Sequence, residues 1–182
     1  EATDNLLAML PVKLQEAAAK TLWKKDVEVR FGASVSEFDG PCVTLKGGKR
    51  IPSHTMVWAA GVRAVDLTGL LGLPVDRLGR VKVEKTLNLA DHPEVFVVGD
   101  AAFIDGMPLP MVAPVAIQQA EVAARNIALA IRKEPLREFR YKDKGSLATI
   151  GRNAAVASVG KIQVRGWFAW AMWLAVQIVF LI

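Results

Sequence analysis

The feature that most constrains the fold is an almost purely apolar run, residues 94–98, that ends in Gly99-Asp100. Such a run is typical of a strand buried on both faces of a parallel sheet. Ligands bind open α/β sheets at the carboxyl ends of their strands, where the Asp100 carboxylate would lie. Gly99 would allow a close backbone approach, and the carboxylate could accept hydrogen bonds from hydroxyl groups. Gly-Asp also ends many ordinary strands, so the pair alone favours a plain turn.

A second apolar run, residues 55–60, stops at Gly61 and predicts another buried strand of the same kind. The hydrophobic periodicity of the remaining segments predicts an α/β fold, with Gly47-Gly48 as a hairpin turn. We expect helices over 11–25 and 115–133, a short helix or turn over 65–73, and strands over 27–31, 33–38, 42–45, 50–51, 79–83, 146–150 and 154–159.

Charge and cysteine content exclude several functions. The net charge is +5, but no basic run is longer than Lys24-Lys25 and no aromatic residues are interleaved, so nucleic-acid binding is not expected. Cys42 is the single cysteine, which excludes an intrachain disulfide, a CxxC pair and a thiolate metal site, and fits a reducing, cytosolic environment. The two histidines, His54 and His92, lack the spacing of metal ligands.

The last segment, 166–182, carries no charged residue and holds three tryptophans. Residues 167–182 would form a helix about 24 Å long at roughly 1.5 Å per residue, shorter than a hydrocarbon core of ~30 Å. The segment could be the start of a spanning helix, a core helix, or an interfacial anchor preceded by Lys161 and Arg165. The chain opens at Glu1 and stops inside this apolar run, so we expect it to be a piece of a longer protein.

Two motifs resemble those of flavoproteins with two dinucleotide-binding domains. Residues 93–100 look like the second FAD signature of that superfamily, and the resemblance implies that Gly99 and Asp100 contact FAD, with the Asp100 carboxylate on the ribityl hydroxyls. Residues 57–62 resemble the signature that links the NADH-binding and FAD-binding domains, which implies that Ala60 and Gly61 lie at the NADH site. The resemblance therefore implies FAD and NADH as cofactors and portions of two Rossmann-like domains.

Two further stretches resemble the type II NADH dehydrogenases, which are FAD-dependent NADH:quinone oxidoreductases. Residues 112–120 are similar to the AQxxxQ quinone motif; Gln118 matches its second glutamine, whereas Pro114 replaces the first. In the family this motif opens a helix beneath the flavin, which would place Ala116 against FAD. Residues 141–151 resemble the pattern Y-x-x-x-G-x-L-A-x-x-G, which places Lys144 near quinone and flavin, although a solvated lysine is an equal alternative.

The resemblance implies the C-terminal part of an enzyme that transfers electrons from NADH through FAD to a membrane quinone without pumping protons. It implies a peripheral, monotopic protein on the cytoplasmic face of the inner or plasma membrane, and it allows a homodimer. The resemblance also places Glu1 where the family has an acidic residue that hydrogen-bonds the adenine ribose of NADH. The expected parts are 1–60 of the NADH-binding domain, 61–135 of the FAD-binding domain, and a membrane-associating region over 136–182.

Other functions remain open from the sequence. No G-x-G-x-x-G loop occurs, so we expect these 182 residues alone to bind the cofactors poorly and to be inactive. A soluble FAD-dependent reductase would share the two flavoprotein motifs but would not explain the apolar tail. A non-catalytic membrane-binding module with the same fold is another alternative. A flavoenzyme with a reactive cysteine pair is disfavoured because Cys42 stands alone.

Overall fold

The computed structural model describes residues 1–70 and 72–181. Its contacts divide the chain into two compact units, and the chain passes from the first to the second and back. The first unit comprises residues 1–58 and 144–182, and the second comprises residues 59–143. The mixed α/β class expected from the sequence is confirmed.

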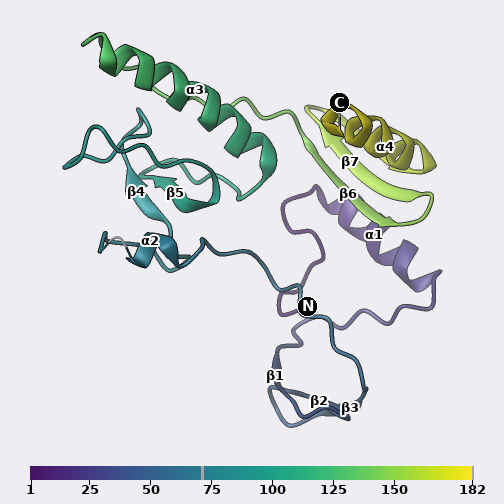
Figure 1. Ribbon diagram of the computed structural model, residues 1–182. Helices are drawn as coiled ribbons and strands as arrows, with labels where there is room; N and C mark the ends of the chain where they lie inside the picture. The colour runs from purple at the N-terminus through teal and green to yellow at the C-terminus, as the bar shows by residue number, and fades with distance from the viewer. Residues whose placement is uncertain (71, 182) are drawn as a thin grey trace. The chain divides into compact units, whose positions relative to one another are not determined.

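In the first unit, one three-stranded antiparallel sheet lies between two helices (Figure 1). Its elements are α1 (Val12–Trp23), β6 (Ser146–Gly151), β7 (Ala154–Val159), β8 (Ile162–Gly166) and α4 (Trp167–Leu181). Strand β7 is central, and its side chains alternate between the two faces. Val156 packs with Leu14 of α1, whereas Ala155 and Ala157 pack with Ala169 of α4. The strands expected at 146–150 and 154–159 are confirmed, while β8 was not anticipated.

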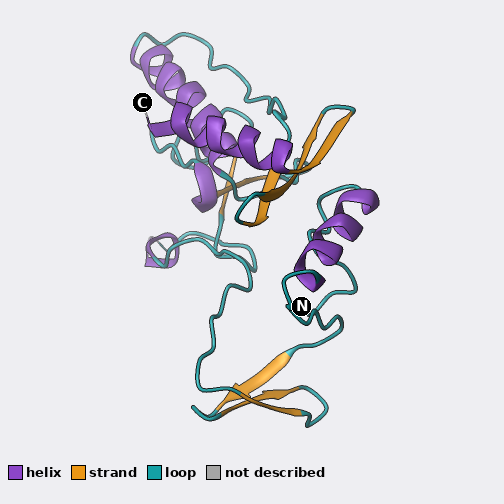
Figure 2. Ribbon diagram, turned by 90° about the vertical axis from the view of Figure 1, so that its right-hand side faces the viewer, coloured by secondary structure: helices purple, strands orange, loops and turns teal. Residues whose placement is uncertain are grey.

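A second antiparallel sheet of the first unit, drawn in orange in Figure 2, forms as the sequence predicts. It contains β1 (Val35–Phe38), β2 (Cys42–Leu45) and β3 (Arg50–Pro52). Gly47 and Gly48 have φ angles of +97° and +83°, which side chains other than glycine rarely adopt, so they make the β2–β3 turn. Cys42 is buried, and its Sγ accepts a hydrogen bond from Arg50 Nε at 3.3 Å.

The second unit has a small parallel sheet covered by a long helix. Its elements are α2 (Leu67–Leu70), β4 (Val81–Val83), the 3₁₀ turn η1 (Gly99–Ala101), β5 (Ala102–Ile104) and α3 (Ala113–Ile131). β4 pairs in parallel with β5, and their apolar residues share one core with Ala123 of α3 and with Phe139. Pro114 lies in the first turn of α3, where a missing N–H leaves no helical hydrogen bond unmade.

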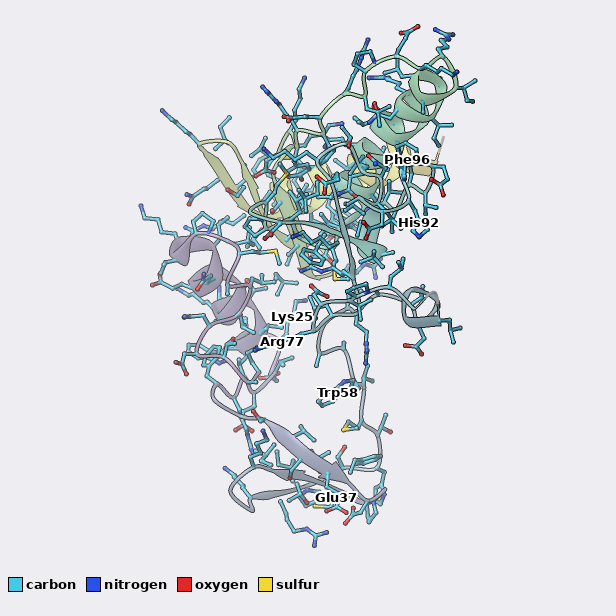
Figure 3. All side chains as sticks on the ribbon, turned by 90° about the vertical axis from the view of Figure 1, so that its left-hand side faces the viewer. Lys25, Glu37, Trp58, Arg77, His92 and Phe96 are labelled. Atoms are coloured by element: carbon cyan, nitrogen blue, oxygen red, sulfur yellow. The ribbon has the colours of Figure 1, made fainter. Side chains whose placement is uncertain are left out.

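Three expected strands are wrong, one from an alternating pattern at 27–31 and two from the apolar runs at 55–60 and 94–98: none of these segments is a strand in the structure. At 55–60 the chain is extended but exposed, with Val57 85% and Trp58 65% accessible (Trp58 is labelled in Figure 3). A buried parallel strand needs a hydrogen-bonded neighbour on each side, and the described residues provide none for this segment.

Within the described residues, the segment 94–98 forms its cross-strand backbone hydrogen bonds along one side. The Val97 N–H donates to the Leu87 carbonyl at 3.0 Å, the Leu89 N–H donates to the Val95 carbonyl at 3.0 Å, and Phe96 forms an isolated bridge with Asn88. Figure 3 labels Phe96 on this segment. Phe96, Val97 and Val98 pack against the core of the second unit. The apolar character of the run therefore reflects this packing, although the segment is not a regular strand.

The apolar tail is helical as α4, and its Ala169 side is buried against β7. Its other side is largely accessible; the exposed large residues are Trp167, Phe168, Met172, Leu174, Val176, Ile178 and Val179. Among the residues that the structure describes, no helix combines the length and the hydropathy required to cross a bilayer.

Candidate functional site

The candidate site is the η1 turn beside the first turn of α3. Gly99 has a φ of +67°, and a Cβ atom placed on it would lie 3.3 Å from Cβ of Ala116. Its N–H donates a 2.6 Å hydrogen bond to Oε1 of Gln119, which is only 1% exposed. The structure thus brings Gly99 and Ala116 together, as the motifs predict, and adds Gln119, which the motifs did not indicate.

Asp100 follows Gly99 in the same turn, and its side chain is exposed. Over residues 1–70 and 72–181, no hydrogen bond or ion pair engages its carboxylate. A carboxylate that projects from a fixed turn and has no protein partner can accept hydrogen bonds from a bound ligand.

The N-terminus of α3 is a second element of the site. Its N-cap residue, Val112, has an extended backbone and no side chain that could cap the helix, and the first turn carries no acidic residue. No side chain of the helix's own first turn compensates the helix dipole at this end, and the dipole favours a negatively charged group nearby. Because Ala116 lies in this first turn and adjoins Gly99, the helix end and the Asp100 turn are neighbours.

Gln118 is held to the backbone of Lys142 through both ends of its amide. Nε2 of Gln118 donates to the Lys142 carbonyl at 3.1 Å, and the Lys142 N–H donates to Oε1 at 3.0 Å. One N–H and one lone pair of the amide remain for another partner. Lys144, the other residue expected near this site, belongs to the first compact unit and has an exposed side chain.

Two buried polar residues of α3 were missed by the motifs. Asn126 is fully buried; its Nδ2 donates to the carbonyls of Thr86 (2.8 Å) and Arg137 (2.9 Å), and its Oδ1 accepts from the Arg137 N–H. Gln119 lies on the same face of the helix. Both lie on the buried face of α3 together with Val115 and Ala123. Because buried amides are almost always hydrogen-bonded, an amide on an otherwise apolar helix face indicates a specific hydrogen bond.

The residues expected to bind NADH lie in both units. Glu1 is exposed, and the hydrogen bonds that its carboxylate accepts from the Thr3 N–H (3.1 Å) and hydroxyl (2.9 Å) lower its pKa. Ala60 and Gly61 are exposed at the start of the second unit, and Gly61 has a φ of +103°. In the described part of the chain, no group of three or more His, Cys, Asp or Glu side chains could hold a metal ion.

Comparison with protein families and curated sequences identifies relatives. The family model described as pyridine nucleotide-disulphide oxidoreductase matches residues 1–120. The type II NADH:quinone oxidoreductase NdhA of Mycobacterium tuberculosis is 40% identical over all of this chain and 41% of its own length. The type II NADH:quinone oxidoreductase of Haemophilus influenzae is 32% identical over 93% of this chain and 40% of its own length. The chain thus spans about two fifths of the length of these relatives.

Solved structures show the same fold at low sequence identity. NDH2 of Plasmodium falciparum, in a complex with NADH, matches all of this chain and 54% of its own chain, with a TM-score of 0.78 and 17% identity. The ferredoxin reductase for the CYP199A2 system of Rhodopseudomonas palustris matches 91% of this chain and 48% of its own, with a TM-score of 0.59 and 15% identity.

Proposed function

Since the chain belongs to the pyridine nucleotide-disulphide oxidoreductase family, we propose that it is the C-terminal part of a type II NADH:quinone oxidoreductase that uses FAD. The names of relatives at 40% and 32% identity support the activity. The structural observation that carries the proposal is the Gly99–Asp100 turn, which is fixed against the first turn of α3 and leaves the Asp100 carboxylate without a protein partner.

The residues of this site fit FAD. Asp100 would accept hydrogen bonds from the ribityl hydroxyls, because its carboxylate is exposed and unengaged among the described residues. Gly99 and Ala116 present little side-chain bulk next to it. The uncapped N-terminus of α3 would stabilise negative charge on the flavin ring system. FAD, when bound, supplies the two-electron redox chemistry between NADH and quinone.

Gln118 and Lys144 would orient the quinone. Gln118 keeps one amide N–H and one lone pair free of the Lys142 backbone, enough for one quinone oxygen. Lys144 offers an ammonium group at an exposed position. On the other substrate, Glu1, Ala60 and Gly61 would contact NADH, with the ionised Glu1 carboxylate accepting hydrogen bonds from the adenine ribose.

The membrane would be contacted by α4. Its outer side exposes large apolar residues, and two basic residues precede it: Lys161 in the turn before β8 and Arg165 within β8. That combination suits a helix lying at the surface of an anionic bilayer. From the resemblance to the type II enzymes, we further propose a monotopic protein on the cytoplasmic face of the membrane that does not pump protons. We also propose that the protein forms a homodimer. In the same proposal, residues 1–60 belong to the NADH-binding domain, residues 61–135 to the FAD-binding domain, and residues 136–182 to a membrane-associating region.

The test is a flavin titration of the full-length protein purified from membranes. We expect flavin absorbance to bleach when NADH is added and to recover when a short-chain quinone is added. Bleaching without recovery would point to a soluble-acceptor reductase and overturn the quinone site. A protein without flavin would favour a non-catalytic module.

Asp100→Asn tests the carboxylate itself. We expect the variant to bind FAD about tenfold less tightly, since one charge-assisted hydrogen-bonding group is lost. Asp91→Asn is the matched control, because Asp91 is also exposed but lies outside the η1 turn. Equal FAD affinity of the Asp100 variant and the wild type would contradict the assignment of this residue.

A further inference from the structure

We propose that Gln119 is a positioning residue for the flavin: by accepting the Gly99 N–H, it fixes the turn that aims the Asp100 carboxylate at FAD. The inference rests on the proposed FAD site, because Gln119 would affect FAD binding only by positioning Asp100. It adds a residue that neither flavoprotein motif contains.

The hydrogen bond is well placed to control the turn. Gln119 is 1% exposed, and its Oε1 accepts from the Gly99 N–H at 2.6 Å. A side chain so buried has few alternative rotamers, and a partly buried backbone N–H is costly to leave without an acceptor. Among the hydrogen bonds of the described residues, this one joins α3 directly to η1.

The turn is held from a second side by packing. Val98 and Ala102 are extended, with φ angles of −140° and −113°, and Gly99 between them has a φ of +67°. A Cβ atom on Gly99 would lie 3.3 Å from Cβ of Ala116, which is tight, so a larger residue would force Ala116 to shift and would also be strained at this φ. Residues 116 and 119 are neighbours on one face of α3, so a single helix face supplies both the packing contact and the hydrogen bond.

Asp100 depends on this backbone for its direction. In the part of the chain that the structure describes, no side chain holds its carboxylate. The course of the backbone through η1 therefore sets where the carboxylate points, and that course is fixed by Gln119 and Ala116. A carboxylate displaced by even a fraction of an ångström would lose hydrogen-bond geometry toward a rigid ligand.

The adjacent glutamine does something different. Successive residues of a helix point about 100° apart, so Gln118 and Gln119 face different neighbours. Gln118 binds the backbone of Lys142, whereas Gln119 binds that of Gly99. The resemblance to the quinone motif singles out Gln118; the structure assigns the flavin turn to Gln119.

A double-mutant cycle on the full-length protein tests the inference. The variants are Gln119→Leu, Asp100→Asn and the combination, and FAD affinity is measured by flavin fluorescence together with the melting temperature of the apoprotein. We expect Gln119→Leu to weaken FAD binding about tenfold, as expected for a partly buried donor left unpaired. Because Gln119 acts through Asp100, the double variant should lose clearly less affinity than the product of the two single losses.

Ala123→Gly is the matched control for a purely structural effect. Ala123 lies on the same buried face of α3, one helical turn beyond Gln119, and packs in the hydrophobic core, so we expect the substitution to loosen the helix and lower the melting temperature without removing the hydrogen bond to Gly99. Its effect on FAD affinity should be small. When Ala123→Gly is combined with Asp100→Asn, the loss of affinity should equal the product of the two single losses. Gln119→Met, which also lacks an acceptor oxygen but is unbranched, replaces Gln119→Leu if the leucine variant does not fold.

The outcomes separate the two proposals. Coupling between positions 119 and 100, with none for the control, supports the inference. If Asp100→Asn weakens FAD binding but Gln119→Leu behaves like the control, the positioning role is overturned and the FAD site stands. If the wild-type protein holds no FAD, or Asp100→Asn binds it normally, the proposed site fails and the inference with it.

Discussion

At the scale of single residues, several motif positions have a structural reason that is independent of any ligand. Gly145, in the stretch that resembles the quinone-enzyme pattern, has a φ of +97°, and a Cβ atom there would overlap the carbonyl oxygen of Ser158 and lie 2.9 Å from Cα of Val159. Gly99 is likewise required by its contact with α3. A glycine in a functional motif can therefore be demanded by neighbouring backbone.

Gly145→Ala should destabilise the full-length protein by at least about 2 kcal/mol, because it combines left-handed strain with a backbone overlap. Chemical denaturation measures the change. The matched control is Gly47→Ala, since Gly47 has the same φ of +97° but nothing within 4 Å of the added atom. The control should cost only the strain, about 1 kcal/mol. Equal losses for both variants would show that Ser158 and Val159 move away easily.

At the scale of elements, small residues decide how closely α4 approaches its sheet. Ala155 and Ala157 of β7 meet Ala169 of α4, and Ala157 and Ala169 are both fully buried. Interiors packed at this density leave no room for added methylenes. On the opposite face of β7, Val156 fills the space under α1.

Ala169→Leu should therefore destabilise the protein by about 1–3 kcal/mol through overpacking. Ala175→Leu, at an exposed position of the same helix, is the control and should leave the free energy of unfolding nearly unchanged. Thermal unfolding with both variants provides the measurement. An unchanged stability of the Ala169 variant would mean that α4 does not pack closely on β7.

The turn before β4 gives the structure a pH dependence. Burial alone would raise the pKa of Asp76, but hydrogen bonds from Arg80 and from the Arg80 and Leu78 N–H groups outweigh it and lower the pKa. A carboxyl whose folded pKa is depressed stabilises the fold above its unfolded pKa of about 3.9, and this stabilisation is lost as the pH falls through the folded pKa.

Unfolding measured from neutral pH downward should thus show stability declining below about pH 4. Asp76→Asn should be less stable at neutral pH and should flatten part of that decline. Asp91→Asn, at an exposed residue outside this turn, should leave the profile as it is. A profile for Asp76→Asn parallel to that of the wild type would exclude Asp76 as a source of the dependence.

At the scale of the whole molecule, the chain corresponds to about two fifths of its curated relatives, and apolar side chains at Val57, Trp58, Val62 and Val65 are exposed. The residues proposed for FAD are present, but no glycine-rich loop that would cradle a pyrophosphate is. The proposed site would thus supply only part of the contacts that a dinucleotide needs.

We therefore expect these 182 residues, expressed alone, to lose FAD during gel filtration while the full-length protein retains it. Flavin absorbance of the protein peak measures retention, and circular dichroism of both samples confirms that each is folded. Retention of FAD by the folded short chain would mean that Asp100, α3 and their neighbours suffice for binding.

The sequence by itself determined the elements whose pattern is local. Helical periodicity predicted α1 and α3, paired glycines predicted the β2–β3 turn, and alternating segments predicted β6 and β7. Motif resemblance indicated the family and brought Gly99 and Ala116 to one site. The helices, the turn and the strands depend on residues a few positions apart, so their physical causes can be read along the chain, whereas the site was indicated by resemblance alone.

Only the tertiary structure decided which apolar runs become strands and which backbone groups the glutamines of α3 bind. Residues 55–60 and 94–98 have strand composition, yet a strand exists only where neighbouring backbone completes its hydrogen bonds. Likewise, Gln118 and Gln119 are the same residue type at adjacent positions. They bind different partners because their side chains leave α3 in different directions. Hydrogen bonding and packing between distant segments are properties of the folded neighbourhood, which local sequence does not encode.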